Sequence, residues 1–150
     1  MIRWILYGLI LAVVLTVPLE RTDVAKLQPV QTVCVYCDES GFVVKTDTGD
    51  EGRGETIQTA LKDLQETTPA VVYLDTADFV LFAKNAESAI EDMRGVLKGS
   101  VEVYTFEGDP DLKDASKYLE IHGNGPVLKS VNKGAKLPFL ECKNGRMKLS

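Results

Sequence analysis

The chain has 150 residues, with 17 basic against 22 acidic side chains and a formal net charge of −5. Such a balance argues against nucleic acid as a partner, because that affinity comes mainly from Lys and Arg that neutralise phosphates. Three cysteines and one histidine are too few for a disulfide framework or for the usual four ligands of a closed zinc site, so we expect neither a metal nor a cofactor.

The N-terminal segment is apolar and uncharged from Trp4 to Leu19, with Arg3 before it and Glu20 after it. Its length is near the lower limit of roughly 17–25 residues for a membrane-spanning helix. It lacks the cleavage site of a secretory signal, so we expect residues 1–19 to be an uncleaved transmembrane signal anchor and residues 20–29 a juxtamembrane linker. The positive-inside rule then places the rest on the extracytoplasmic side. The alternatives are a removed signal and a buried helix of a soluble protein.

The next segments predict a β-hairpin and then a helix. Alternation at Val30–Tyr36 and the apolar run Phe42–Thr46 predict two strands joined by a turn. The glycine-rich segment 47–55 is expected to be a connector, because its glycines fit no phosphate-binding pattern and its carboxylates miss the calcium-loop order. A helix is expected from Thr56 to Thr67, and its apolar face comprises Ile57, Ala60, Leu61 and Leu64.

The second half of the expected domain, which spans residues 30–150, alternates strands with helices. Apolar runs at 70–74 and 79–83 predict strands, and the second is continuous, as in a strand covered on both faces. The remaining elements are expected to be a helix at 85–97, a strand at 101–106, a helix at 109–122 capped by Asp109, a strand at 127–131, and a hairpin at 137–149 turning at Asn144-Gly145. The order predicts an α+β fold in which a mixed β-sheet packs with about three helices.

Cys34 and Cys37 have the spacing of a redox motif but lie on an expected strand. Residues i and i+3 of a strand point to opposite faces and are about 10 Å apart, whereas a disulfide needs Cα atoms within about 7 Å. We therefore expect buried or edge cysteines and no catalytic residue, and His122 has no nucleophilic serine motif beside it. A membrane-tethered thiol oxidoreductase using Cys34 and Cys37 is the alternative from the enzyme class.

Three stretches, Gly54–Leu64, Tyr73–Glu87 and Leu137–Ser150, share a pattern of apolar and small residues. Taken in order, they resemble the first domain of the C subunits of spore germinant receptors, the Ger(x)C family. The chain departs from the family in lacking the lipid-bearing cysteine, in having Asp75-Thr76 where Gly-His is common, and in lacking two further domains. The family is non-enzymatic and works in a membrane receptor complex. The resemblance therefore implies a binding or assembly role in spore germination, with receptor subunits of the inner spore membrane as partners.

Charge is distributed unevenly along the chain. Residues 20–112 carry 8 basic and 19 acidic side chains, and residues 113–150 carry 8 basic and 3 acidic. A basic terminal quarter suits anionic headgroups or an acidic partner, unless it faces the acidic part within one fold. An uncovered strand edge at 126–132 or 137–149 is a further pairing surface. The candidate interaction surface comprises Lys129, Lys133, Lys136, Lys143, Arg146 and Lys148. An envelope or sporulation protein without a receptor role is the alternative function.

Overall fold

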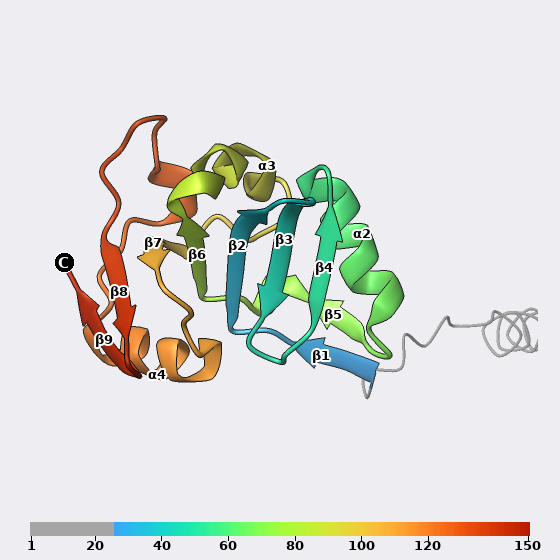
Figure 1. Cartoon of the computed structure of the whole chain (residues 1–150), viewed down its shortest axis with the longest axis horizontal. Helices are drawn as coiled ribbons and strands as arrows, with labels where there is room; N and C mark the ends of the chain where they lie inside the picture. The colour runs from blue at the N-terminus through green and yellow to red at the C-terminus, as the bar shows by residue number, and fades with distance from the viewer. Residues whose placement is uncertain (1–25) are drawn as a thin grey trace, which may run out of the picture.

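The computed structural model describes residues 26–150, which form a seven-stranded mixed sheet with helices on both faces (Figure 1). The spatial order is β4-β3-β2-β6-β7-β8-β9. The strands are β2 (Thr32–Asp38), β3 (Gly41–Thr46), β4 (Glu51–Gly54), β6 (Phe79–Ala83), β7 (Glu102–Glu107), β8 (Phe139–Lys143) and β9 (Arg146–Leu149). Strands β2, β6, β7 and β8 are parallel, while β3 and β4 at one edge and β9 at the other are antiparallel. The predicted α+β fold with a mixed sheet is confirmed.

The expected anchor at residues 1–19 lies outside the described residues, as does the expected linker up to residue 25. Within residues 26–150, no helix combines the length and the apolar character that crossing a bilayer requires.

Two apolar layers hold the helices against the sheet. Helices α2 (Ile57–Thr67) and α3 (Ile90–Arg94) pack on one face, and α4 (Leu112–His122) packs on the other. Successive residues of a strand point to opposite faces, so Val33 and Val35 join the first layer and Cys34 the second. Strand β6 is buried from Phe79 to Phe82, which confirms a strand covered on both faces. Burial of apolar side chains in these layers stabilises the fold by about 25 cal/mol for each Å² of apolar surface removed from water.

Helix α2 begins where its sequence provides a cap. The Thr56 hydroxyl accepts a hydrogen bond from the Thr59 backbone N–H at 3.2 Å, and the Thr59 hydroxyl accepts one from the Thr56 N–H at 2.9 Å. These bonds satisfy backbone donors that lack a partner inside the helix. The helix ends at Thr67, before Pro69, as predicted. Its buried residues are Ile57, Ala60 and Leu64, whereas Leu61 is only half-buried.

Both predicted hairpins are confirmed. Strands β8 and β9 turn at Asn144 and Gly145, whose φ angles are 50° and 73°. Positive φ at both central residues is typical of a type I′ turn, whose twist matches that of the flanking strands. Strands β2 and β3 pair from Val33 opposite Thr46 to Asp38 opposite Gly41.

The segment 47–55 is not the irregular connector that its glycines suggest, because it contains β4. Strand β4 pairs with β3, and Val44 lies opposite Gly52. A Cβ on Gly52 would collide with the backbone of α2 at Ala60 and Leu64. The glycine therefore lets the helix approach the edge of the sheet closely. This requirement comes from tertiary packing, whereas the glycine content of the segment alone indicates only a flexible connector.

Three further predictions were wrong in detail. Segment 127–131 forms the 3₁₀ turn η4 (Leu128–Ser130) and one isolated bridge to β7, because burial of Leu128 and Val131 in the first layer turns the chain inward. The helix expected at 85–97 begins as the 3₁₀ turn η3 (Lys84–Ala89), with no side-chain cap. Asp111 rather than Asp109 caps α4, since its carboxylate accepts the N–H groups of the first turn.

A separate pair of short parallel strands, β1 (Leu27–Pro29) and β5 (Val71–Tyr73), lies beside the main sheet. The strand predicted at 70–74 is thus present but does not extend the large sheet. The Gln65 side chain of α2 bonds both the carbonyl and the N–H of Val72, at 2.9 and 3.3 Å. It satisfies β5 backbone groups that would otherwise form an open edge.

Candidate functional site

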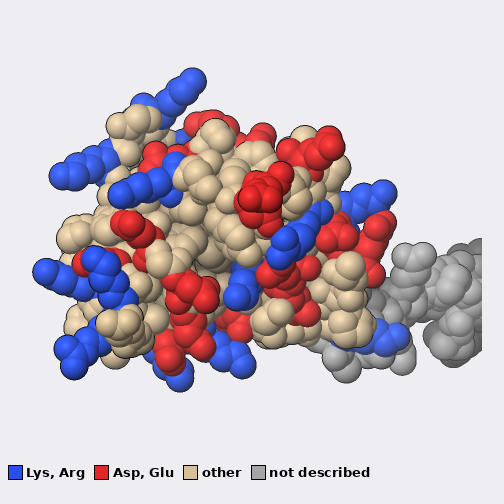
Figure 2. Space-filling view, in the orientation of Figure 1, with Lys and Arg blue, Asp and Glu red and all other residues tan. Residues whose placement is uncertain are grey.

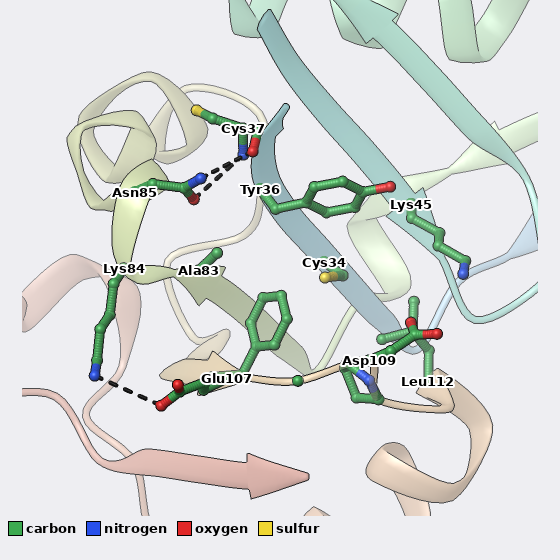
Figure 3. Close-up of a pocket in the computed structure, with 13 residues that line it drawn as sticks. Cys34, Tyr36, Cys37, Lys45, Ala83, Lys84, Asn85, Glu107, Asp109 and Leu112 are labelled. Carbon is green, nitrogen blue, oxygen red and sulfur yellow. Dashed lines mark hydrogen bonds and ion pairs between the residues drawn. The ribbon is translucent and has the colours of Figure 1, made fainter. Parts of the chain in front are cut away.

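A cavity of about 530 Å³ opens at the carboxyl ends of β2, β6 and β7 (Figure 3). Strand β6 leads into η3 and α3 on one face of the sheet, whereas β7 leads into α4 on the other. Connections that diverge to opposite faces leave a crevice between two strand ends, which is where open α/β sheets hold ligands. The volume lies within the range of roughly 300–1,000 Å³ for ligand pockets.

Small residues form the floor of this cavity and aromatic residues flank it. Val35 pairs with Phe82, so Tyr36 is next to Ala83 in the register, and Ala83 pairs with Phe106. Tyr36, Ala83 and Phe106 thus form a row across three strands on the face that α4 covers elsewhere. The small side chain of Ala83 lies between Tyr36 and Phe106 in this row, and Figure 3 shows Cys34 on β2 below Tyr36, whose ring extends toward Lys45. Partial burial raises the pKa of the Tyr36 hydroxyl.

Charged groups line two sides of the cavity. Lys45 and Asp109 lie on one side, from β3 and from the loop after β7, and neither has an ion-pair partner within 4.0 Å among residues 26–150. On the other side, Lys84 pairs with Glu107 at 3.7 Å. Asn85 closes the end of the cavity, since its side chain donates to the carbonyl of Cys37 at 2.8 Å and accepts from its N–H at 3.4 Å.

The two cysteines of the redox-like spacing lie on β2, as predicted, and face opposite sides of the sheet. Cys34 belongs to the layer under α4 and is 3% exposed, while Cys37 packs against the other layer. Both thiols are free, and burial raises the pKa of Cys34 to about 12. A nucleophilic cysteine needs a lowered pKa to form its thiolate. Cys34 and Cys37 therefore do not share a face of the sheet, and neither thiol has a lowered pKa.

We expect Cys34 to resist iodoacetamide at pH 8 until the protein unfolds, because its thiol is buried and protonated. Cys37 and Cys142 are half-buried and should react first. Mass spectrometry of the labelled peptides, with and without denaturant, measures the three rates. Equal labelling of Cys34 and Cys37 in the folded protein, or a disulfide between them, would restore the oxidoreductase hypothesis.

All six basic residues of the predicted interaction surface are exposed. Figure 2 shows Lys and Arg side chains projecting from the end of the molecule where Figure 1 places β8 and β9. Lys143, Arg146 and Lys148 lie on that hairpin, and Lys133 and Lys136 lie in the loop before it. Lys129 lies apart on η4, where its side chain packs beside Gly99. The hairpin also supplies Glu141, whose pKa Lys143 lowers through a direct ion pair.

His122 ends α4 and its ring packs against Tyr118, with ring centroids 4.7 Å apart. Within the described part of the chain, no group of three or more His, Cys, Asp or Glu side chains is placed to hold a metal ion.

Comparison with protein-family models, with curated proteins and with solved structures finds no match to this chain. The function is therefore inferred from the geometry of the basic surface and of the cavity.

The sequence predicted the exposure of the basic residues but not the cavity. Its residues come from four separate segments, and none forms a motif on its own. One signal was available. Polar residues follow two strands closely: Lys84 and Asn85 come directly after β6, and Asp109 comes two residues after β7. Polar residues immediately after parallel strands gather at one edge of a sheet.

Proposed function

We propose that this chain is a non-catalytic binding module, held at a membrane by residues 1–19, that docks through its basic end onto an acidic protein surface. One observation carries this proposal. Lys133, Lys136, Arg146 and Lys148 are exposed, and none has a carboxylate within 4.0 Å in residues 26–150. Unpaired like charges at one end of an acidic molecule produce a local positive potential that attracts an acidic partner.

Internal pairing was the alternative explanation for the uneven charge. Two acidic residues of segment 47–55 bond instead with their own surroundings: Glu51 pairs with Arg53 at 2.6 Å, and Asp50 accepts from Thr48 at 2.7 Å and from Gln28 at 3.0 Å. Among the six basic residues, only Lys143 has an ion pair in the described residues, and it is with Glu141 on the same hairpin. The positive charge of this end is therefore available to another molecule.

The position of the surface favours a protein partner over the bilayer. Figure 1 places β1, where the described chain begins, and the β8–β9 hairpin toward opposite ends of the long axis. Residues 1–19 precede β1 in the chain. A membrane that holds them would therefore lie toward the β1 end of the domain, and the hairpin would point away from the membrane. An acidic face of a receptor subunit would suit the resemblance to germinant-receptor C subunits, and another envelope or sporulation protein is the alternative partner.

Charge reversal tests the proposal on the full chain in nanodiscs of neutral lipid. We expect it to bind immobilised polyglutamate at low salt and to release it as salt shortens the screening length to below about 8 Å. The triple variant Lys133→Glu, Lys136→Glu and Lys148→Glu should weaken binding by roughly tenfold or more, because each exposed pair contributes about 0.2–1 kcal/mol and reversal adds repulsion.

The matched control reverses Lys62, Lys113 and Lys117, which are exposed on α2 and α4. It changes the net charge equally, so it should bind polyglutamate within about twofold of the unaltered chain. Equal weakening by both triple variants would show that net charge acts alone and would contradict the proposal. Binding to phosphatidylglycerol vesicles without binding to polyglutamate would replace the protein partner with the lipid surface.

A further inference from the structure

The cavity at the ends of β2, β6 and β7 is separate from the basic surface, and the two sets of residues do not overlap. Its floor is apolar and small, formed by Cys34 and Ala83. Neighbouring strands are about 4.8 Å apart, so Tyr36 and Phe106 start about 10 Å from each other across Ala83. Aromatic rings in contact have centroids about 4.5–7 Å apart. A flat ring placed over Ala83 would therefore have one aromatic residue on each neighbouring strand of the cavity lining.

Lys45 gives this space a charged side. It lies opposite Cys34 on β3, so its side chain is on the cavity face of the sheet. Unlike Lys84, which pairs with Glu107, the half-buried Lys45 has no carboxylate within 4.0 Å in residues 26–150. Figure 3 shows its ammonium group directed along the side of the cavity toward the loop that carries Asp109. A half-buried ammonium without a partner is a site for an anionic group of a ligand.

The anion that fits carries one negative charge. Asp109 lies on the same side of the cavity and would repel a second charge. The N-terminus of α4, which could otherwise receive a phosphate, is already occupied, because the Asp111 carboxylate accepts the N–H groups of Lys113 and Asp114 at 3.0 and 3.1 Å. Nucleotides and other phosphate esters are therefore disfavoured.

We propose that this cavity binds a small, flat aromatic carboxylate, with its ring over Ala83 between Tyr36 and Phe106 and its carboxylate facing Lys45. The apolar floor and the aromatic walls select the flat ring. The lone ammonium selects the single carboxylate. The site does not depend on the docking surface, so either can fail without the other.

Benzoate is the probe, and cyclohexanecarboxylate, with the same charge and a puckered ring, is its comparator. The full chain in neutral nanodiscs is titrated with each and observed by saturation-transfer NMR. We expect benzoate to bind at least tenfold more tightly than cyclohexanecarboxylate. Ala83→Leu should fill the space between the rings and reduce benzoate binding at least tenfold, whereas Ala135→Leu, in the exposed loop before β8, should not change it.

Two charge variants test the assigned orientation of the carboxylate, and they should change the affinity for benzoate in opposite directions. Lys45→Gln should weaken benzoate binding about tenfold and leave binding of uncharged benzyl alcohol unaltered, while Asp109→Asn should strengthen benzoate binding. Lys62→Gln on α2 is the control. Circular dichroism checks that each variant folds. If Ala83→Leu does not fold, Tyr36→Leu replaces it as the test, because this substitution removes one of the two aromatic side chains.

The absence of benzoate binding at millimolar concentration, or equal affinities for the flat and puckered acids, would overturn the proposal. So would full benzoate binding by a folded Ala83→Leu or, in its place, Tyr36→Leu variant. Polyglutamate binding by Ala83→Leu should match that of the unaltered chain. A loss of benzoate binding is thereby distinguished from a failure of the docking surface.

Discussion

Replacing Leu64 by alanine is expected to lower the free energy of unfolding by about 2–5 kcal/mol. Leu64 is fully buried in the layer between α2 and the sheet, where its Cβ lies over Gly52 of β4. Removing its methyl groups loses their transfer free energy and leaves a cavity, because the surrounding strands cannot close completely. Urea denaturation followed by circular dichroism measures the change.

Two neighbours on the same helix serve as comparisons. Leu61, which the sequence places on the same apolar face, is only half-buried, so Leu61→Ala should cost less than Leu64→Ala. Gln58 is exposed, and Gln58→Ala should change the free energy of unfolding by no more than about 0.5 kcal/mol. Equal losses for Leu61 and Leu64 would mean that α2 is rotated relative to the sheet.

Gly52→Ala is expected to lower the free energy of unfolding by about 1–3 kcal/mol or more. A Cβ at this position would lie inside the contact distance of the Ala60 carbonyl oxygen and the Leu64 nitrogen. Both are backbone atoms of α2, so no side-chain rotation relieves the collision. The expected result is a displaced helix or a weakened β4, measured by urea denaturation and by hydrogen exchange at β3 and β4.

Gly95→Ala is the matched control for this substitution. Gly95 follows α3 with φ of −80°, and a Cβ there would meet only the Asp92 carbonyl oxygen at an ordinary 3.8 Å. It should leave stability unchanged or raise it by about 0.4–1 kcal/mol, because alanine reduces the conformational freedom of the unfolded chain. A comparable loss at both glycines would contradict the close packing of α2 on β4.

Local signals in the sequence predicted most of the elements correctly. The stop of α2 before Pro69, the Asn144-Gly145 turn and the continuous apolar run of β6 each act over a few residues, so their meaning does not depend on the rest of the chain. The opposite facing of Cys34 and Cys37 followed from the period of a strand alone. The exposure of the six basic residues likewise follows from their positions in short strands and turns.

Tertiary packing decided what local signals could not. Segment 47–55 became a strand because β3 offered a partner and α2 required a residue without a side chain at Gly52. The cavity exists because β6 and β7 lead to helices on opposite faces, and no short window of sequence records which face a helix covers. Tyr36, Ala83 and Phe106 are far apart in sequence, and the strand register alone brings them into one row. The sequence by itself determined most of the elements and the exposure of the basic residues, whereas the order and register of the strands created the cavity.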